Sequence, residues 1–263
     1  MMLSTIIIVC LGLSVYGLPV DNNDRQFLKD VNPELLGGGF EGDMILPSDF
    51  NLSRGAAIYG ARRRWPNRII PYDISAITDA NDRTTIKNAM NKLMFDVGTS
   101  VPGQIARQTC VVFRPAQTDD KEILKIQYGN GCSATIGYGE NYEKTLNLQP
   151  RGCFHSGIIQ HELNHVLGFF HEQSRPDRDS YITIHQANII PNQEHNFKKY
   201  AWGSDLQSQG FSYDYSSLMH YGPGSFSVNG KPTITPINSN VVIGQREKLS
   251  ETDIAEIRQY YSC

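Results

Sequence analysis

Two histidines at a helical spacing, His161 and His165, could bind one metal ion. On a helix, side chains four residues apart project from the same face, with about 6 Å between their Cβ atoms. Gly168 can adopt a positive φ, end the helix and turn the chain so that His171 supplies a third nitrogen. Three neutral imidazoles that leave a fourth position for water are typical of a catalytic zinc site. Glu162 follows the first ligand and is placed to take a proton from zinc-bound water.

The alternative is that these histidines are ordinary residues on a helix surface. His161 and His165 alone leave this alternative open, whereas Gly168 and His171 at fixed offsets favour the zinc site strongly. The remaining histidines lack such spacing and are interpreted as structural or surface residues; they are His155, His185, His195 and His220.

Residues 171–179 and the later segment 217–221 resemble signature sequences of the astacin family of zinc metalloproteases. The second segment is similar to the Met-turn of that family. By this resemblance, Met219 forms an apolar floor beneath the metal. Tyr221 is, by the same resemblance, a further zinc ligand that swings away to stabilise the transition state.

The resemblance implies an α+β fold, namely the zincin-like two-lobe metalloprotease fold. Its upper lobe has a mixed twisted sheet and helices, and its lower lobe is mostly irregular with a C-terminal helix. Apolar residues at helical spacing independently predict a helix over about 80–98, and the zinc helix is predicted over 157–167. A capping pattern at Ser250 and Asp253 predicts a helix over 250–261.

Short apolar or alternating runs predict strands over 111–113, 123–128 and 145–149. The resemblance implies that 145–149 is an antiparallel edge strand that borders the cleft. An unpaired edge can bind an extended substrate backbone through main-chain hydrogen bonds. We therefore expect this strand to pair with substrate.

The chain has 263 residues, 40% of them hydrophobic, and a net charge of −3. This composition allows a substantial core and does not indicate a nucleic-acid partner or an anionic membrane. Residues 1–17 contain a short apolar run followed by small residues, which predicts a secretory signal peptide. An uncleaved interfacial anchor is the alternative, because the run has no preceding positive charge. No later stretch is long and apolar enough for a membrane helix.

Residues 18–54 are polar and rich in Asp, Asn and Gly, so they have little apolar surface with which to fold alone. They are interpreted as a propeptide. Residues 40–43 resemble the F-x-G-D motif by which astacin propeptides place a carboxylate on the zinc, here Asp43 in the latent form only. A solvated acidic loop is the alternative. Asn51 lies in a glycosylation sequon of the same region.

Arg54 is the basic residue best placed for activation by a trypsin-like protease. The mature chain would then begin at Gly55 or Ala56, and the sequence leaves this choice open. By resemblance, the new amino terminus is buried near the glutamate that follows the third histidine, Glu172.

Removal of the signal peptide takes away Cys10 and leaves Cys110, Cys132, Cys153 and Cys263. Four cysteines in a secreted chain predict two disulfides, and the sequence alone permits three pairings. The resemblance implies Cys110 with Cys263 and Cys132 with Cys153. A four-cysteine zinc cluster is the competing interpretation, but the paired C-x-x-C spacing of such clusters is missing.

The predicted organisation is a minimal astacin: signal peptide 1–17, propeptide 18–54 and catalytic domain 55–263. The upper lobe covers about 55–167 and the lower lobe about 168–263. The resemblance extends over nearly everything after residue 40.

We expect a secreted zinc metalloendopeptidase, made as a latent zymogen, that binds one Zn²⁺ and hydrolyses peptide bonds in proteins or peptides. Its zinc-bound water would be activated by Glu162, and Tyr221 would assist. A monomer without nucleic-acid or membrane partners is expected. The alternatives are a catalytically silent binding or signalling protein that keeps the zinc fold, and a zinc hydrolase of small molecules.

Overall fold

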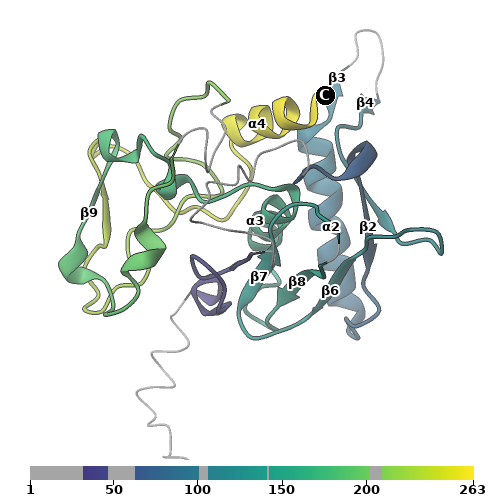
Figure 1. Cartoon of the computed structure of the whole chain (residues 1–263), viewed down its shortest axis with the longest axis horizontal. Coiled ribbons are helices and arrows are strands. Elements are labelled where there is room, and N and C mark those ends of the chain that lie inside the picture. Colours follow the sequence, from purple (N-terminus) through teal and green to yellow (C-terminus); the bar gives the residue numbers. More distant parts are fainter. Residues whose placement is uncertain (1–31, 47–62, 101–105, 141, 202–208) are drawn as a thin grey trace, which may run out of the picture. The chain divides into compact units, whose positions relative to one another are not determined.

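The computed structural model describes residues 32–46, 63–100, 106–140, 142–201 and 209–263, shown in colour in Figure 1. The described residues contain three α-helices: α2 (Ala80–Val97), α3 (Ser156–Leu167) and α4 (Glu251–Tyr261). Short 3₁₀ helices are η1 (Pro33–Leu36), η4 (Pro66–Arg68), η5 (Glu172–Ser174), η6 (Arg178–Ser180), η7 (Gln186–Asn188) and η8 (Glu194–Phe197). The three helices predicted from the sequence are confirmed to within one residue at each end.

The main sheet has six strands in the described part of the chain. In sheet order they are β1 (Met44–Ile45), β7 (Cys132–Thr135), β8 (Lys144–Leu148), β6 (Leu124–Tyr128), β2 (Ile69–Asp73) and β5 (Val112–Pro115). Strands β8, β6, β2 and β5 are parallel to one another, whereas β7 is antiparallel to β8. The predicted mixed sheet is therefore confirmed.

The predicted edge strand is wrong. The segment predicted over 145–149 is β8, which lies between β6 and β7 and has both edges paired. The antiparallel strand next to it, β7, has the sequence Cys-Ser-Ala-Thr, which lacks the alternation that reveals a strand. β1, from the segment interpreted as propeptide, pairs with β7 in parallel. Strand order is a long-range property, and the apolar pattern of β8 does not encode it.

The described residues form two hydrophobic cores. Helices α2 and α3 pack against each other and against the sheet in the larger core. The smaller core contains Phe197, Tyr221 and Ile234 and includes the antiparallel pair β9 (Ile182–Ile184) and β10 (Ile234–Pro236). In the view of Figure 1, the segment that carries β9 lies on the opposite side of α3 from β2. A further short pair is formed by β3 (Thr99–Ser100) and β4 (Arg107–Gln108).

Helix α4 packs in the larger core, although it follows the lower-lobe segments in sequence. Its buried residues Ile257, Tyr260 and Tyr261 belong to the core shared with α2 and α3. The disulfide between Cys263 and Cys110 fastens the end of this helix to the segment before β5. The chain therefore returns to the larger core at its end.

The end of α3 is held by side chains from distant segments. The indole of Trp65 donates to the carbonyl of Val166 over 2.8 Å, and the hydroxyl of Tyr261 donates to the carbonyl of Leu167 over 2.9 Å. These bonds satisfy carbonyls that have no partner within a helix. They fix the last turn of the helix that carries the candidate metal ligands. None of the described helices is long and apolar enough to cross a membrane.

Candidate metal centre

Helix α3 carries His161, Glu162 and His165, and all three side chains are buried. Gly168 ends the helix with a φ of 105°, in the left-handed region, as the sequence predicts. The chain then brings His171 back to the same place. The ring centroid of His165 lies 4.8 Å from the centroids of both His161 and His171. The three candidate ligands therefore form one cluster.

The Nε2 atoms of the three histidines converge on the carboxylate of Asp43. Asp43 Oδ2 is 3.1 Å from Nε2 of His161, and Asp43 Oδ1 is 3.4 Å from Nε2 of His165 and 3.3 Å from Nε2 of His171. One ligand atom from each of the four residues lies within 4.8 Å of the others, and all four residues are buried. A carboxylate from residues 40–43 is thus in direct contact with the histidine cluster.

Each histidine directs its other nitrogen, Nδ1, to an acceptor on a different segment. These acceptors are the carbonyl of Leu218 at 2.9 Å from His161, the carbonyl of Phe169 at 2.7 Å from His165, and Oε2 of Glu41 at 2.9 Å from His171. Because a carbonyl can only accept, Nδ1 of His161 and of His165 carries a proton, and Nε2 is the nitrogen left for a metal. This is the arrangement of histidines that bind metals.

The cluster fits one zinc ion. Three imidazole nitrogens and a carboxylate oxygen are ligands that zinc prefers. Nε2 of His165 and Oδ1 of Asp43 make no hydrogen bond among the residues that the structure describes, although both are buried. Buried polar atoms rarely remain without a partner, and a bound cation satisfies both. His161, His165 and His171 are therefore the group able to hold one zinc ion.

Glu162 lies beside this cluster and is fully buried. Neither of its carboxylate oxygens makes a hydrogen bond within the described part of the chain. Burial raises the pKa of Glu162 well above its usual value, and the nearby charges of Asp43 and Glu34 add to this effect. Burial alone would also raise the pKa of Asp43, but the histidines around it lower that pKa well below the usual range.

The predicted Met-turn lies against the same cluster. Tyr221 places its ring 4.6 Å from the ring of His171, and its hydroxyl donates to the main-chain carbonyl of Glu41. Met219 is buried, and its carbonyl accepts from the amide of Glu172 over 3.0 Å. Segment 217–221 is therefore tied to both α3 and η5 through its main chain.

Glu172 itself is buried next to His171. Its Oε1 accepts from the amide of Asp214 over 2.7 Å and lies 3.4 Å from the guanidinium of Arg175. Burial raises the pKa of Glu172 well above its usual value, and Arg175 opposes this shift.

Glu41 is a site residue that sequence reasoning missed. Its carboxylate accepts from three donors, namely the hydroxyl of Ser174 at 2.8 Å, the hydroxyl of Tyr200 at 2.7 Å and Nδ1 of His171. It has a φ of 49° within the tight turn that precedes Asp43. Its position inside the F-E-G-D motif was the available signal, but the motif alone does not assign a role to its second residue.

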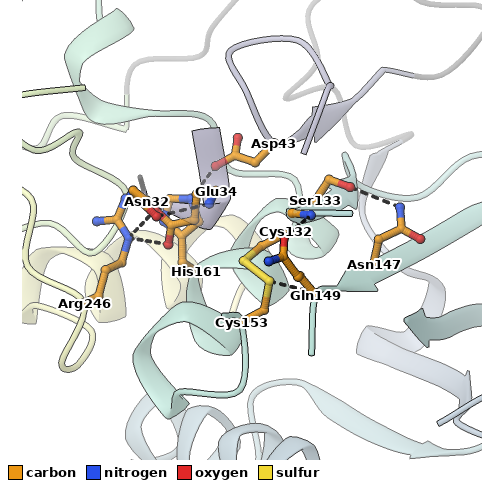
Figure 2. The surroundings of a disulfide bond; sticks show 11 residues. Asn32, Glu34, Asp43, Cys132, Ser133, Asn147, Gln149, Cys153, His161 and Arg246 are labelled. Carbon is orange, nitrogen blue, oxygen red and sulfur yellow. Dashed lines mark hydrogen bonds and ion pairs between the residues drawn. A yellow bond between two sulfur atoms is a disulfide. The ribbon is translucent and has the colours of Figure 1, made fainter. Parts of the chain in front are cut away.

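Arg246 and Glu34 form a second feature that the sequence did not reveal. Nε of Arg246 lies 2.7 Å and 2.9 Å from the two carboxylate oxygens of Glu34 (Figure 2). Gly244, with a φ of 81°, lets this loop approach the chain closely, since a Cβ there would lie 2.3 Å from the Cα of Gly222. Glu34 and Arg246 are 212 positions apart in the sequence, and no local pattern connects them.

The disulfides are Cys110–Cys263 and Cys132–Cys153, the pairs implied by the resemblance. The second lies close to the site and is shown in Figure 2. Several predicted positions lie outside the described residues: the signal segment 1–17, Asn51, Arg54 and the alternative mature ends Gly55 and Ala56.

Comparison with known proteins agrees with this geometry. The model of the peptidase family "Astacin" matches residues 57–262. Low choriolytic enzyme from Oryzias latipes is 37% identical over 85% of this chain and 78% of its own length. The solved structure of high choriolytic enzyme 1, a hatching enzyme zinc-protease from the same fish, superimposes with a TM-score of 0.64. It is 40% identical, and the match covers 76% of this chain and 93% of that one.

Other relatives are longer. Protein SpAN from Strongylocentrotus purpuratus is 36% identical to this chain. The match covers 89% of this chain but only 39% of the length of SpAN. Zinc metalloproteinase nas-13 from Caenorhabditis elegans is 38% identical to this chain. The match covers 85% of this chain and 46% of the length of nas-13, so this chain spans less than half the length of either relative.

Fold and site together define the class of zinc metalloendopeptidases. Within that class, the chain belongs to the astacin family.

Proposed function

We propose that this chain is a secreted zinc endopeptidase made as a latent precursor and activated by removal of its propeptide. The observation that carries the proposal is the histidine cluster. Three Nε2 atoms face one point, the Nδ1 atoms face outward, and the carboxylate of Glu162 lies beside them without a hydrogen bond among the described residues. Such a cluster can hold a Lewis acid next to a general base.

His161, His165 and His171 would hold the metal. Zinc bound there supplies a Lewis acid that lowers the pKa of water and polarises a peptide carbonyl. Glu162 takes up the proton of the attacking water and passes it to the nitrogen of the leaving amine. Tyr221 donates its phenolic hydrogen to the developing oxyanion. Met219 would form the apolar floor beneath the metal. No covalent intermediate is required.

Residues 32–46 would keep the precursor latent. The carboxylate of Asp43 contacts the histidine nitrogens that would bind the metal. The main-chain carbonyl of Asp43 accepts from the amide of Ala134 in β7 over 2.8 Å. The amide of Ile136 donates to the carbonyl of Ile45 over 3.1 Å. The same segment therefore covers both the histidine cluster and the edge of β7 that faces away from β8. An extended substrate would need both surfaces, so cleavage and release of this segment should precede activity.

Processing belongs to the same proposal. A trypsin-like protease would cut after Arg54, giving a catalytic domain that begins at Gly55 or Ala56. Glu172, buried and beside the cluster, is the proposed acceptor for the new amino terminus. The signal segment 1–17, glycosylation at Asn51 and a monomeric state complete the proposal.

The test is hydrolysis of a denatured protein by the purified full chain before and after limited trypsin treatment. Activity should appear only after treatment, and a zinc chelator should abolish it. Glu162→Ala should lower kcat/KM by at least about 10²-fold, since general acid–base catalysis contributes about 10² to 10⁴. Added zinc should restore the chelated wild-type enzyme but not the variant.

Activity of the untreated full chain equal to that of the trimmed chain would refute latency. If the trimmed, zinc-loaded protein cleaves nothing in a broad peptide library, the protease assignment fails. The catalytically silent binding or signalling protein would then be favoured.

A further inference from the structure

The main chain of Tyr221 is held on both sides by buried side chains. Its amide donates to Oε1 of Gln173 over 3.2 Å, and its carbonyl is 2.7 Å from Nδ1 of His220. Because a carbonyl can only accept, Nδ1 of His220 carries the proton and Nε2 has a lone pair. The hydroxyl of Tyr213 lies 2.6 Å from this Nε2 and therefore donates to it. A directed chain of two hydrogen bonds runs from Tyr213 to the carbonyl of Tyr221.

The start of this chain is fixed by aromatic packing. The ring of Tyr213 stacks on that of Tyr181, with centroids 4.7 Å apart and an angle of 7° between the planes. Tyr215 contacts Tyr213 edge to face at 5.4 Å. Tyr213, His220 and Tyr221 are all buried. The hydroxyl of Tyr213 therefore has a fixed direction, and it can orient the imidazole of His220.

The phenol of Tyr221, unlike its main chain, is held by the proposed propeptide. Its hydroxyl donates to the carbonyl of Glu41, which belongs to the proposed propeptide. Release of the propeptide takes this partner away and leaves Gln173, His220 and Tyr213 in place. The side chain can then turn about a main chain that does not move.

We propose that Tyr213 and His220 are positioning residues that hold the main chain of Tyr221 so that its phenol reaches the developing oxyanion. This inference rests on the proposed role of Tyr221. A small rotation of the main chain is amplified at the end of a tyrosine side chain. A misplacement of about 1 Å can lower a rate by about 10²-fold.

The first test is Tyr213→Phe in the trypsin-activated, zinc-loaded enzyme. This change removes the hydroxyl and keeps the stacked ring. We expect kcat to fall about tenfold, in the range found when groups that orient catalytic ligands are removed, with KM close to the wild-type value.

Tyr215→Phe is the matched control. The hydroxyl of Tyr215 donates to the carbonyl of Tyr181 over 2.8 Å in the same aromatic cluster, but it is not bonded to His220. Its loss should leave kcat unchanged. Equal loss of kcat in the two variants would assign Tyr213 a general structural role and overturn the proposal.

A double-mutant cycle with Tyr221→Phe separates positioning from folding. If Tyr213 acts through the phenol of Tyr221, Tyr213→Phe should lower kcat no further in the Tyr221→Phe background. Losses that multiply would overturn the proposal. His220→Asn keeps an N–H donor near the position of Nδ1 and should retain more activity than His220→Leu.

Affinity for a peptide phosphinate, a tetrahedral anion that mimics the reacting carbonyl, gives a readout independent of turnover. Tyr213→Phe should weaken this affinity about tenfold, and Tyr215→Phe should not. Equal affinities would contradict the inference. If the wild-type enzyme cleaves no substrate, the proposed function fails, and phosphinate affinity still decides whether Tyr213 acts on Tyr221.

Discussion

At the scale of single residues, a carboxylate of the proposed propeptide neutralises the guanidinium of Arg246. Glu34 is 2% exposed and accepts from Nε of Arg246 through both carboxylate oxygens. Arg246 also donates to the carbonyl of His220 over 3.0 Å, next to Tyr221. Burial opposes ionisation of Glu34, but Arg246 outweighs it and lowers the pKa of Glu34. The ion pair therefore links the proposed propeptide to the loop around Arg246.

Glu34→Gln should destabilise the precursor by about 3 kcal/mol, because the guanidinium of Arg246, whose side chain is only 15% exposed, loses its counter-charge. Denaturant unfolding of the full chain measures this loss. Trypsin-activated enzyme prepared from the variant is the control, since residue 34 has then been removed. It should unfold like activated wild-type enzyme. An unchanged precursor would show that the ion pair contributes nothing to stability.

Glu256 should make the stability of the precursor depend on pH. Burial raises its pKa to about 8 from the usual 4.5, Asp253 and Asp214 add to this shift, and Arg175, 3.9 Å away, opposes it. Glu172 also interacts with Glu256. Between pH 4.5 and about 8 the unfolded chain has released the proton that the folded chain still holds. The stabilisation from this group is thus complete below pH 4.5 and is lost as the pH rises to about 8.

Glu256→Gln should accordingly reduce the fall in melting temperature between about pH 5 and pH 8, and it should stabilise the protein at the higher pH. Thermal unfolding at both values measures the effect. Glu251→Gln, which changes an exposed residue of the same helix, should leave the pH dependence as in the wild type. If the melting temperature depends on pH equally in Glu256→Gln and wild type, Glu256 is excluded as the source of the pH dependence.

At the scale of elements, Asp253 joins the start of α4 to the Met-turn. Its carboxylate accepts from the amide of Ser250 over 2.8 Å, which completes the capping box predicted from the sequence. It also accepts from the hydroxyl of Ser217 over 2.7 Å and from the amide of Leu218 over 2.8 Å. The carbonyl of Leu218 in turn accepts from Nδ1 of His161. One helix cap therefore supports a turn that orients a metal ligand.

Gly157 allows the first turn of α3 to contact the loop of Arg246. A Cβ at this position would lie 1.8 Å from the carbonyl oxygen of Arg246 and 2.3 Å from its carbonyl carbon. These are backbone atoms, so relief requires movement of the loop or the helix. Alanine would gain about 1 kcal/mol of helix propensity, but the clash should cost about 3 kcal/mol.

The net prediction for Gly157→Ala is a loss of about 2 kcal/mol in the free energy of unfolding, measured with denaturant. Gly224→Ala is the control, because no atom lies within 4 Å of a Cβ built there. It should be close to neutral. A stabilised Gly157→Ala variant would mean that the higher helix propensity of alanine outweighs the clash with the backbone of Arg246.

At the scale of the whole molecule, the two disulfides close loops of very different length. Cys110–Cys263 spans 153 residues and Cys132–Cys153 spans 21. The longer bridge ties α4 to the segment before β5. The entropy that a cross-link removes from the unfolded chain grows with loop length.

Replacing both Cys110 and Cys263 by Ser should lower the free energy of unfolding by roughly 5 kcal/mol, against roughly 3 kcal/mol for Cys132 and Cys153. Denaturant unfolding of the two double variants compares them directly. A greater loss for the shorter loop would contradict the loop-entropy explanation.

The sequence by itself determined the features that local chemistry specifies. The spacing of His161 and His165, the turn at Gly168 and the capping pattern at Ser250 each depend on residues a few positions apart. With the apolar periodicity over about 80–98, they predicted the three described helices and the metal cluster correctly. The resemblance added the family, the disulfide pairs and the position of Asp43 relative to the histidines.

Only the tertiary structure decided which distant segments meet. It placed β8 inside the sheet and β7 between β8 and β1, and it returned α4 to the larger core. It also paired Glu34 with Arg246 and placed Glu41 against His171. Strand order and ion pairs between remote residues depend on which surfaces pack together. No periodicity or local motif in the sequence carries that information, because burial and pairing arise from the whole chain at once.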